Sequence, residues 1–286
     1  MRNILFFLPL LGCIFILSCS RPAPAGDELR PMAQQTVTAE PQGEREAFID
    51  DYWRWSFGDA GLPDELARKV AESAAQGPDF VMELLEILEG DPYLYILVDK
   101  QHGLPEGYEP EDLVDLSGGS YQVSREGLKL RRAAAAALEE MALAARTEGV
   151  TLAAGSAYRS AAYQAEVYAR EVSNYGQEAA DRESARPGYS QHQTGLAVDF
   201  APIDDAFADT AAGRWLLKNA GSFGWSLSFP NGYEAVTGYR WESWHYRYVG
   251  NSLVRFIDTY FDGVQQYGLQ FINAWIESSE PKRAGL

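Results

Sequence analysis

The chain has 286 residues, of which 46% are hydrophobic and 23% are charged, a balance typical of a folded globular protein. This length can bury the core of one large domain, or of one domain with a smaller helical part. Lys and Arg number 24 against 41 Asp and Glu, which gives a formal net charge of −17. The acidic balance argues against nucleic-acid binding, which depends on clustered basic residues.

The N-terminal segment has the pattern of an export signal. Residues 1–3 carry positive charge, and residues 4–17 form an apolar run that is too short for a comfortable membrane span. The residues that precede Cys19 resemble a bacterial lipobox, so we expect a signal peptide that ends at a lipidated Cys19, and a protein that is exported to the cell envelope and anchored there by lipid. An ordinary cleavage site at residues 23–25, or an earlier lipobox at Cys13, is the alternative.

Shifts in composition predict the domain organisation. Residues 1–19 are the signal peptide, and residues 20–43, rich in Pro, Ala and Gly without periodicity, are a flexible tether. Aromatic and acidic residues at helical spacing predict a helical extension over residues 44–90, with no residue set that suggests chemistry. Residues 91–276 are expected to form the main domain, and residues 277–286 a frayed tail.

Within the main domain, the hydrophobic patterns predict short strands mixed with helices. Strands are expected at residues 93–98, 150–154 and 241–249, a polar loop at 181–187, and helices at 128–148, 161–175, 210–220, 252–261 and 264–276. Asn231-Gly232 between two apolar runs predicts a hairpin over residues 225–236.

Two motifs carry the residues that point to chemistry. The segment S-Q-H-Q-T-G-L-A-V-D-F places His192 seven residues before Asp199, and a second segment places His245 three residues after Glu242. Two imidazoles and one carboxylate form the three-ligand set of catalytic zinc sites, in which water takes the fourth position. Glu242 is then the carboxylate that a metal hydrolase needs as its general base.

Three further features have weaker signals. Arg159 lies between a predicted strand and a predicted helix, where its guanidinium could hold a carboxylate or an oxyanion, although composition alone favours a surface salt bridge. His102 lies among Lys, Gln, Gly and Pro, which favours an exposed loop over a metal ligand. Asp204, Asp205 and Asp209 lack the spacing of an EF-hand loop and are expected to be solvated.

Three motifs in this order resemble those of VanY-type D-alanyl-D-alanine carboxypeptidases, which belong to a group of zinc peptidases that includes lysostaphin-type enzymes and the hedgehog signalling domain. The likeness covers about residues 91–250. The matching residues are Ser156, Tyr158, Arg159, Ser160 and Gln164; Ser190, His192, Gly195, Ala197 and Asp199; and Glu242, Trp244, His245 and Tyr246. The resemblance implies an α+β fold, with a small antiparallel sheet flanked by helices and preceded here by the helical extension.

The resemblance also implies a role for each residue. Zn²⁺ would be bound by His192, Asp199 and His245, while Glu242 would be the general base and Arg159 would steady the oxyanion. Ser190, Gln164 and Tyr158 would lie near the substrate.

The substrate implied by the resemblance is the peptidoglycan stem peptide, from which the enzyme would remove the terminal D-alanine. An L,D-carboxypeptidase or a peptidoglycan endopeptidase could use the same metal centre, because pocket shape decides among them. A non-catalytic module that binds the cell wall is the alternative of another class, but such a module has no need of Glu242.

Overall fold

The structure is a computed structural model, and it describes residues 61–76 and 79–283. The predicted signal peptide, Cys19, the tether and the first part of the helical extension lie outside the described residues. Among the helices that the structure describes, none combines the length and the apolar character needed to cross a bilayer.

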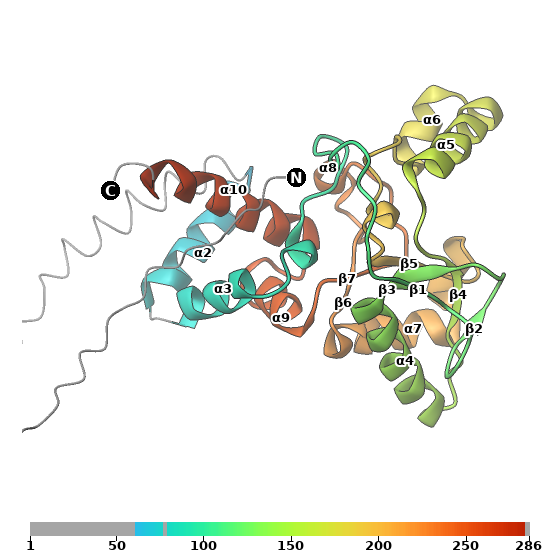
Figure 1. Ribbon diagram of the computed structural model, residues 1–286. Helices are drawn as coiled ribbons and strands as arrows, with labels where there is room; N and C mark the ends of the chain where they lie inside the picture. The colour runs from blue at the N-terminus through green and yellow to red at the C-terminus, as the bar shows by residue number, and fades with distance from the viewer. Residues whose placement is uncertain (1–60, 77–78, 284–286) are drawn as a thin grey trace, which may run out of the picture. The chain divides into compact units, whose positions relative to one another are not determined.

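A five-stranded sheet lies at the centre of the main domain (Figure 1). Its strands, in spatial order, are β2 (Gln122–Val123), β4 (Ala153–Ser156), β5 (Ala197–Phe200), β7 (His245–Tyr248) and β6 (Trp225–Leu227). All neighbours pair antiparallel except β2 and β4, which are parallel. A separate ribbon pairs β1 (Leu113–Asp115) with β3 (Lys129–Arg131). The expected α+β class with a small, largely antiparallel sheet is confirmed.

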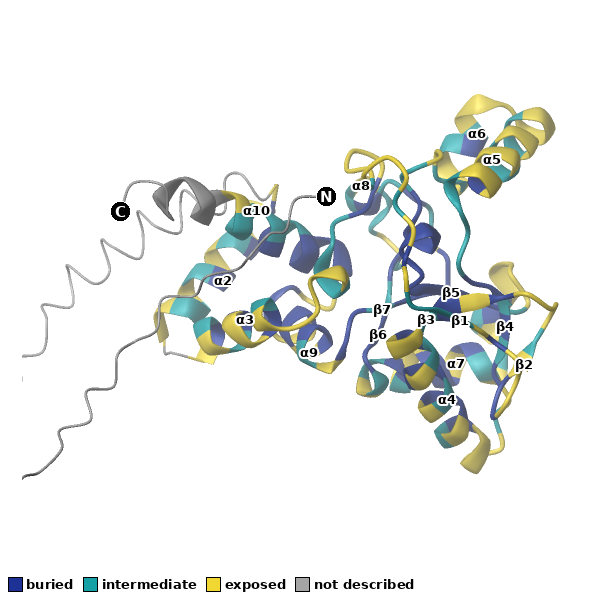
Figure 2. Ribbon diagram, viewed as in Figure 1, coloured by how far each residue is buried: buried dark blue, intermediate teal, exposed yellow. Residues whose placement is uncertain are grey.

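Helices α4 (Arg132–Thr147) and α7 (Ala211–Asn219) contribute to the core that forms around this sheet. The buried residues of α4 recur every three or four positions, so one face of the helix is apolar. The central strands β5 and β7 are largely dark blue in Figure 2, and the outer helical faces are yellow. The helix begins at Arg132 and not at residue 128, because residues 129–131 pair with β1.

A second apolar core joins the two ends of the described chain. It contains α2 (Asp64–Gln76), α3 (Asp79–Glu89), α9 (Asn251–Tyr260) and α10 (Gln265–Arg283). We call these four helices the helical unit; they lie together at the left of Figure 1. The ring of Phe80 lies 5.0 Å from that of Phe256, centroid to centroid. The later half of the predicted extension therefore packs on C-terminal helices, and α10 continues through Glu277, where the sequence predicted a tail.

The remaining elements are short. Helices α5 (Ala161–Tyr175) and α6 (Gln177–Glu183) form a hairpin at the upper right of Figure 1. Helix α8 (Glu234–Thr237) precedes β7. The 3-10 helices are η1 (Pro92–Tyr95), η2 (Gln191–Thr194), η3 (Asp205–Asp209) and η4 (Ala220–Phe223).

Three further local expectations differ from the structure. The strand expected at residues 93–98 is wrong: residues 92–95 form η1, because Asp91 caps a 3-10 turn and Pro92 supports its first position, and residues 96–98 belong to no strand. The hairpin expected over residues 225–236 is wrong, because β6 pairs with β7 and residues 234–237 form α8. The loop expected at 181–187 begins inside α6, whose Asp181 bonds Tyr168 of α5.

Candidate active site

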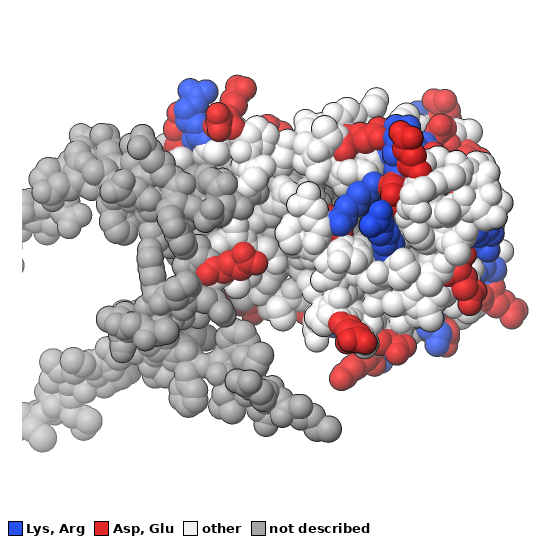
Figure 3. Space-filling model, turned by 90° about the horizontal axis from the view of Figure 1, so that it is seen from above, with Lys and Arg blue, Asp and Glu red and all other residues white. Residues whose placement is uncertain are grey.

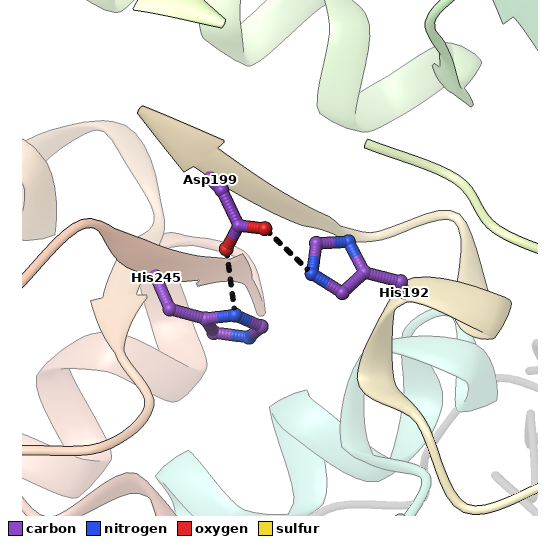
Figure 4. Close-up of side chains that lie close together, drawn as sticks. All are labelled: His192, Asp199 and His245. Atoms are coloured by element: carbon purple, nitrogen blue, oxygen red, sulfur yellow. Dashed lines mark ion pairs between the residues drawn. The ribbon is translucent and has the colours of Figure 1, made fainter. Parts of the chain in front are cut away.

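The structure brings His192, Asp199 and His245 together (Figure 4). Asp199 Oδ2 lies 3.0 Å from His192 Nε2, and Asp199 Oδ1 lies 2.9 Å from His245 Nδ1. All three residues are buried, and their candidate ligand atoms lie within 4.8 Å of one another. Segments far apart in the sequence thus supply one compact set of metal-ligating side chains.

The backbone explains why these side chains meet. Asp199 and His245 are register partners on the antiparallel strands β5 and β7, so their side chains project from the same face of the sheet. His192 lies in η2, where Ser190 Oγ accepts a hydrogen bond from His192 N at 3.3 Å. Gly195 ends η2 with φ of 70°, a left-handed conformation that glycine adopts without penalty, and the chain then enters β5.

The hydrogen bonds of the imidazoles fit a divalent metal. His192 Nδ1 lies 2.7 Å from the carbonyl oxygen of Ala157, which can only accept, so the ring proton lies on Nδ1 and Nε2 presents a lone pair. His245 Nε2 likewise lies 3.2 Å from Gln191 Oε1. Asp199 Oδ1 has no hydrogen bond within the described residues despite the nearby His245. Two lone pairs and a carboxylate that face one another are a donor set for Zn²⁺.

Burial and neighbouring charges keep these groups in the required protonation states. Burial lowers the pKa of His192, against the opposing charge of Asp199, which favours the neutral imidazole. Burial alone would raise the pKa of Asp199, but the two imidazoles outweigh it and hold that pKa below its ordinary value. Both directions favour the forms that metal ligands must take, which are an ionised carboxylate and a neutral imidazole.

Glu242 lies beside this set without belonging to it. Its Oε2 is 3.7 Å from His245 Nδ1, and the residue is 8% exposed. Burial and the negative charge of Asp199 raise the pKa of Glu242 well above its usual value. A carboxylate with a raised pKa binds a proton more readily than an ordinary one, which suits a general base.

Arg159 is held by neutral partners and not by a surface salt bridge. Its Nη1 donates to Gln164 Oε1 at 2.8 Å and its Nη2 to Ser156 Oγ at 3.1 Å, while its backbone N–H bonds the carbonyl of His192. Burial lowers the pKa of Arg159. Because neither side-chain partner is charged, the guanidinium charge is free to act on a bound anion.

One cavity of about 290 Å³ connects these groups. Its lining includes His192, Asp199, His245, Glu242, Arg159 and Ser190, and its walls continue through Phe229, Tyr239, Arg240, Glu171 and Glu183. On the face of the molecule in Figure 3, basic side chains are interleaved with acidic ones. The cavity therefore combines a candidate metal centre, a carboxylate and a guanidinium at one place.

Two residues expected near the substrate do not line the cavity. Gln164 is fully buried behind Arg159, and its Nε2 donates to the carbonyl of Ala185 at 2.6 Å. Tyr158 is half-buried and does not line the cavity. The cavity gives their assignment as substrate-binding residues no support; Gln164 instead positions Arg159. His102 is exposed, as expected, with its Nδ1 2.8 Å from Asp99 Oδ1.

Sequence reasoning missed two residues of the site. Gln191 contacts His245 and lines the cavity, and its place beside His192 in the motif was the available signal. Tyr239 also lines the cavity, and its buried hydroxyl has no hydrogen-bond partner within the described residues. Burial raises the pKa of Tyr239, so the hydroxyl keeps its proton and can donate it to a bound molecule.

Two curated relatives are similar to this chain in sequence. A putative carboxypeptidase of Bacillus subtilis, YodJ, is 38% identical over 197 residues, which span 64% of this chain and 72% of the relative. A D-alanyl-D-alanine carboxypeptidase of Enterococcus faecalis is 35% identical over 164 residues, which span 54% of this chain and 58% of the relative.

Solved structures share the fold. The LD-carboxypeptidase LdcB superposes with a TM-score of 0.53 at 39% identity, over 59% of this chain and 85% of its own. The vancomycin-resistance D,D-pentapeptidase VanY, solved with Zn(II), gives a TM-score of 0.52 at 31% identity, over 62% and 98% of the two chains. VanYB, solved with D-alanine-D-alanine, gives a TM-score of 0.51 at 29% identity, over 65% of this chain and 99% of its own.

The family model for VanY, described as D-alanyl-D-alanine carboxypeptidase, matches residues 127–251. This range contains β4, β5 and β7, and with them every residue of the candidate metal centre and Glu242. Motifs, fold and relatives agree, and the chain belongs to the VanY family of carboxypeptidases.

Proposed function

We propose that the protein is a zinc-dependent D-alanyl-D-alanine carboxypeptidase that hydrolyses the terminal D-alanine from peptidoglycan stem peptides. The observation that carries the proposal is the cavity in which His192, Asp199 and His245 converge beside Glu242 and Arg159. The VanY structure with Zn(II) and the VanYB structure with D-alanine-D-alanine support the metal and the substrate class.

The side chains of the cavity suit hydrolysis without a covalent intermediate. Zn²⁺ bound by the two histidines and the aspartate would lower the pKa of a water molecule and polarise the scissile carbonyl. Glu242 takes the proton of the attacking water and passes it to the leaving amine. Arg159 stabilises the negative charge that develops on the carbonyl oxygen. Ser190 and Tyr239 offer hydroxyl groups at the cavity wall for the end of the peptide.

Glu242→Gln tests the proposed chemistry directly. We expect the variant to bind zinc like the wild type, because Glu242 is not one of the three ligands, and to lose roughly 100- to 10,000-fold in hydrolysis rate on a pentapeptide stem. Glu178→Gln, which changes an exposed carboxylate on α6, is the matched control and should keep wild-type activity. Release of D-alanine by Glu242→Gln at the wild-type rate would refute the mechanism.

An L,D-carboxypeptidase is the second candidate, because LdcB is similar to this chain at 39% identity. The same metal centre serves both reactions, and the shape of the cavity decides which peptide end fits. Mass spectrometry after incubation with pentapeptide and tetrapeptide stems, with and without chelator, separates the two. Cleavage of the tetrapeptide alone would favour the L,D reaction. In a third incubation, with cross-linked dimers, cleavage of the dimers alone would favour an endopeptidase.

We also propose that the protein is exported and anchored to the membrane through lipid on Cys19. The apolar run at residues 4–17 and the lipobox-like residues before Cys19 support this location. The mass of the mature N-terminus tests it, because a lipidated Cys19 adds acyl chains to the first residue. A mature chain that begins with an unmodified Gly26 would rule out this anchor.

A further inference from the structure

A chain of hydrogen bonds leads from the candidate metal centre into the helical unit. Gln191 Oε1 lies 3.2 Å from His245 Nε2 and accepts from Ser228 Oγ at 2.7 Å. Gln191 Nε2 donates to Gln265 Oε1 at 3.5 Å, and Gln265 Nε2 donates to the carbonyl oxygen of Ser226 at 3.3 Å. Gln265 is the first residue of α10, beyond the residues 127–251 that the family model matches.

The carbonyl of Ser226 gives this chain of bonds a direction. A main-chain carbonyl accepts and cannot donate, so the amide NH₂ of Gln265 must face it. Gln265 Oε1 then faces Gln191, whose NH₂ turns toward it, and this leaves Gln191 Oε1 toward His245. If both amides were flipped, Gln265 would place an oxygen 3.3 Å from the Ser226 oxygen, and the two would repel.

The direction of these hydrogen bonds decides which nitrogen of His245 can bind a metal. An acceptor at Nε2 requires the ring proton there, which leaves the Nδ1 lone pair toward Asp199 at 2.9 Å. A hydrogen-bond donor facing Nε2 would instead put the ring proton on Nδ1, and His245 would no longer be a metal ligand. Outer partners of a metal-bound histidine commonly fix its tautomer in this way.

We propose that Gln265 is a positioning residue of the active site, which acts through Gln191 to hold the proton of His245 on Nε2 and to aim Nδ1 at the metal. The inference rests on the proposed zinc site. It also gives the helical unit a part in the reaction, because the packing of α10 on α2, α3 and α9 places Gln265 at the sheet. Gln265 is 1% exposed and does not line the cavity, so its effect does not pass through the substrate.

Histidine NMR of the zinc-loaded wild-type protein tests the direction of these hydrogen bonds. The sequence has only three histidines, so their ring nitrogens can be assigned by single substitutions. We expect His192 to carry its proton on Nδ1 and His245 to carry its proton on Nε2, with slow exchange of the His245 proton. A His245 ring with its proton on Nδ1 would overturn the inference, whatever the enzymatic activity.

Gln265→Met tests the role of the helix. Zinc affinity should fall roughly 10- to 100-fold, the usual cost of losing an outer partner, and the Nε2 proton of His245 should exchange faster. At saturating zinc, kcat should fall while KM stays unchanged. Gln266→Met is the matched control, because Gln266 is also buried on α10 but its amide binds Asp99 Oδ2 at 2.6 Å.

The outcomes separate this inference from the proposed function. If Gln265→Met keeps wild-type zinc affinity and proton exchange, or if Gln266→Met lowers the affinity equally, Gln265 has no specific role. If the wild-type protein binds zinc with the expected tautomers but releases no D-alanine, the proposed function fails and the positioning role stands. A wild-type protein that binds no zinc would overturn both.

Discussion

His245 Nδ1 lies 2.9 Å from Asp199 Oδ1 because the two residues face each other as register partners on β5 and β7. Neither ligand depends on a loop for its position, since the ladder of the sheet holds both backbones. The site is therefore organised by the same hydrogen bonds that form the core of the domain. A one-residue slip between these strands would turn one of the two side chains to the opposite face.

Asp199→Asn should remove zinc binding while the fold is kept. The amide has the shape of the carboxylate but no charge to attract the cation between two neutral imidazoles. We expect zinc affinity to fall by more than the roughly 10- to 100-fold that the loss of an outer partner costs, as measured by calorimetric titration. Circular dichroism provides the control for folding. If the Asp199→Asn variant binds zinc like the wild type, Asp199 is excluded as a ligand.

The metal centre could be predicted from the sequence because each motif is short and its residue types are chemically specific. His192 and Asp199 lie in one segment, and Glu242 lies three residues from His245. Residue type and spacing alone therefore indicated the ligand set and its neighbouring base. The α+β class followed from the resemblance that these motifs support.

The remaining features depend on contacts between distant segments, which local patterns do not encode. Asn231-Gly232 predicted a hairpin, but β6 pairs with the distant strand β7, and residues 234–237 form α8. The bond between Gln191 and Gln265 joins residues 74 apart. The packing of Phe80 on Phe256 likewise required the two ends of the chain to fold together. The motif position of Gln164 also does not show that its amide bonds Arg159.

Gln164→Leu should weaken catalysis through Arg159. Loss of the 2.8 Å bond to Gln164 Oε1 frees one arm of the guanidinium, which then samples more positions. We expect kcat to fall, but by less than the roughly 100- to 1,000-fold that follows the loss of an oxyanion donor, as in Arg159→Ala. A double-mutant cycle checks the coupling. Since Gln164 acts through Arg159, its substitution should cost little more in the Arg159→Ala background, and additive losses would contradict this role.

Gly195→Ala should destabilise the protein through both strain and crowding. The residue has φ of +70°, and an added Cβ would lie 2.9 Å from Arg131 Cγ and Leu113 Cδ2. The left-handed conformation alone costs about 1–2 kcal/mol for a residue with a Cβ, so the free energy of unfolding in urea should fall by more than that. Gly107→Ala is the control, because φ is +74° there with nothing within 4 Å of the added Cβ. Equal losses in the two variants would show that contacts with β1 and β3 do not matter.

Asp181 should give the α5–α6 hairpin a stability that depends on pH. The carboxylate accepts from Arg186 Nη2 at 3.1 Å, Tyr168 Oη at 2.6 Å and Gln177 Nε2 at 3.0 Å. Hydrogen bonds from Arg186, then Tyr168 and Gln177, hold the pKa of Asp181 well below its ordinary value. Because the folded pKa is the lower one, the stabilisation is fully present above the unfolded pKa and is lost as pH falls through the folded pKa.

The free energy of unfolding of Asp181→Asn, compared with the wild type in the presence of chelator, measures this contribution. The variant should be less stable at pH 6, and the difference should shrink steadily below about pH 4, where the unfolded carboxyl binds its proton. Other carboxyl groups titrate in both proteins and cancel in the comparison. Because Ser184 of the cavity wall follows directly from α6, and Tyr189 lies in the segment after it, the variant should also raise KM at neutral pH. A stability difference that stays constant from pH 6 to pH 3 would mean that the charge of Asp181 does not hold the hairpin in place.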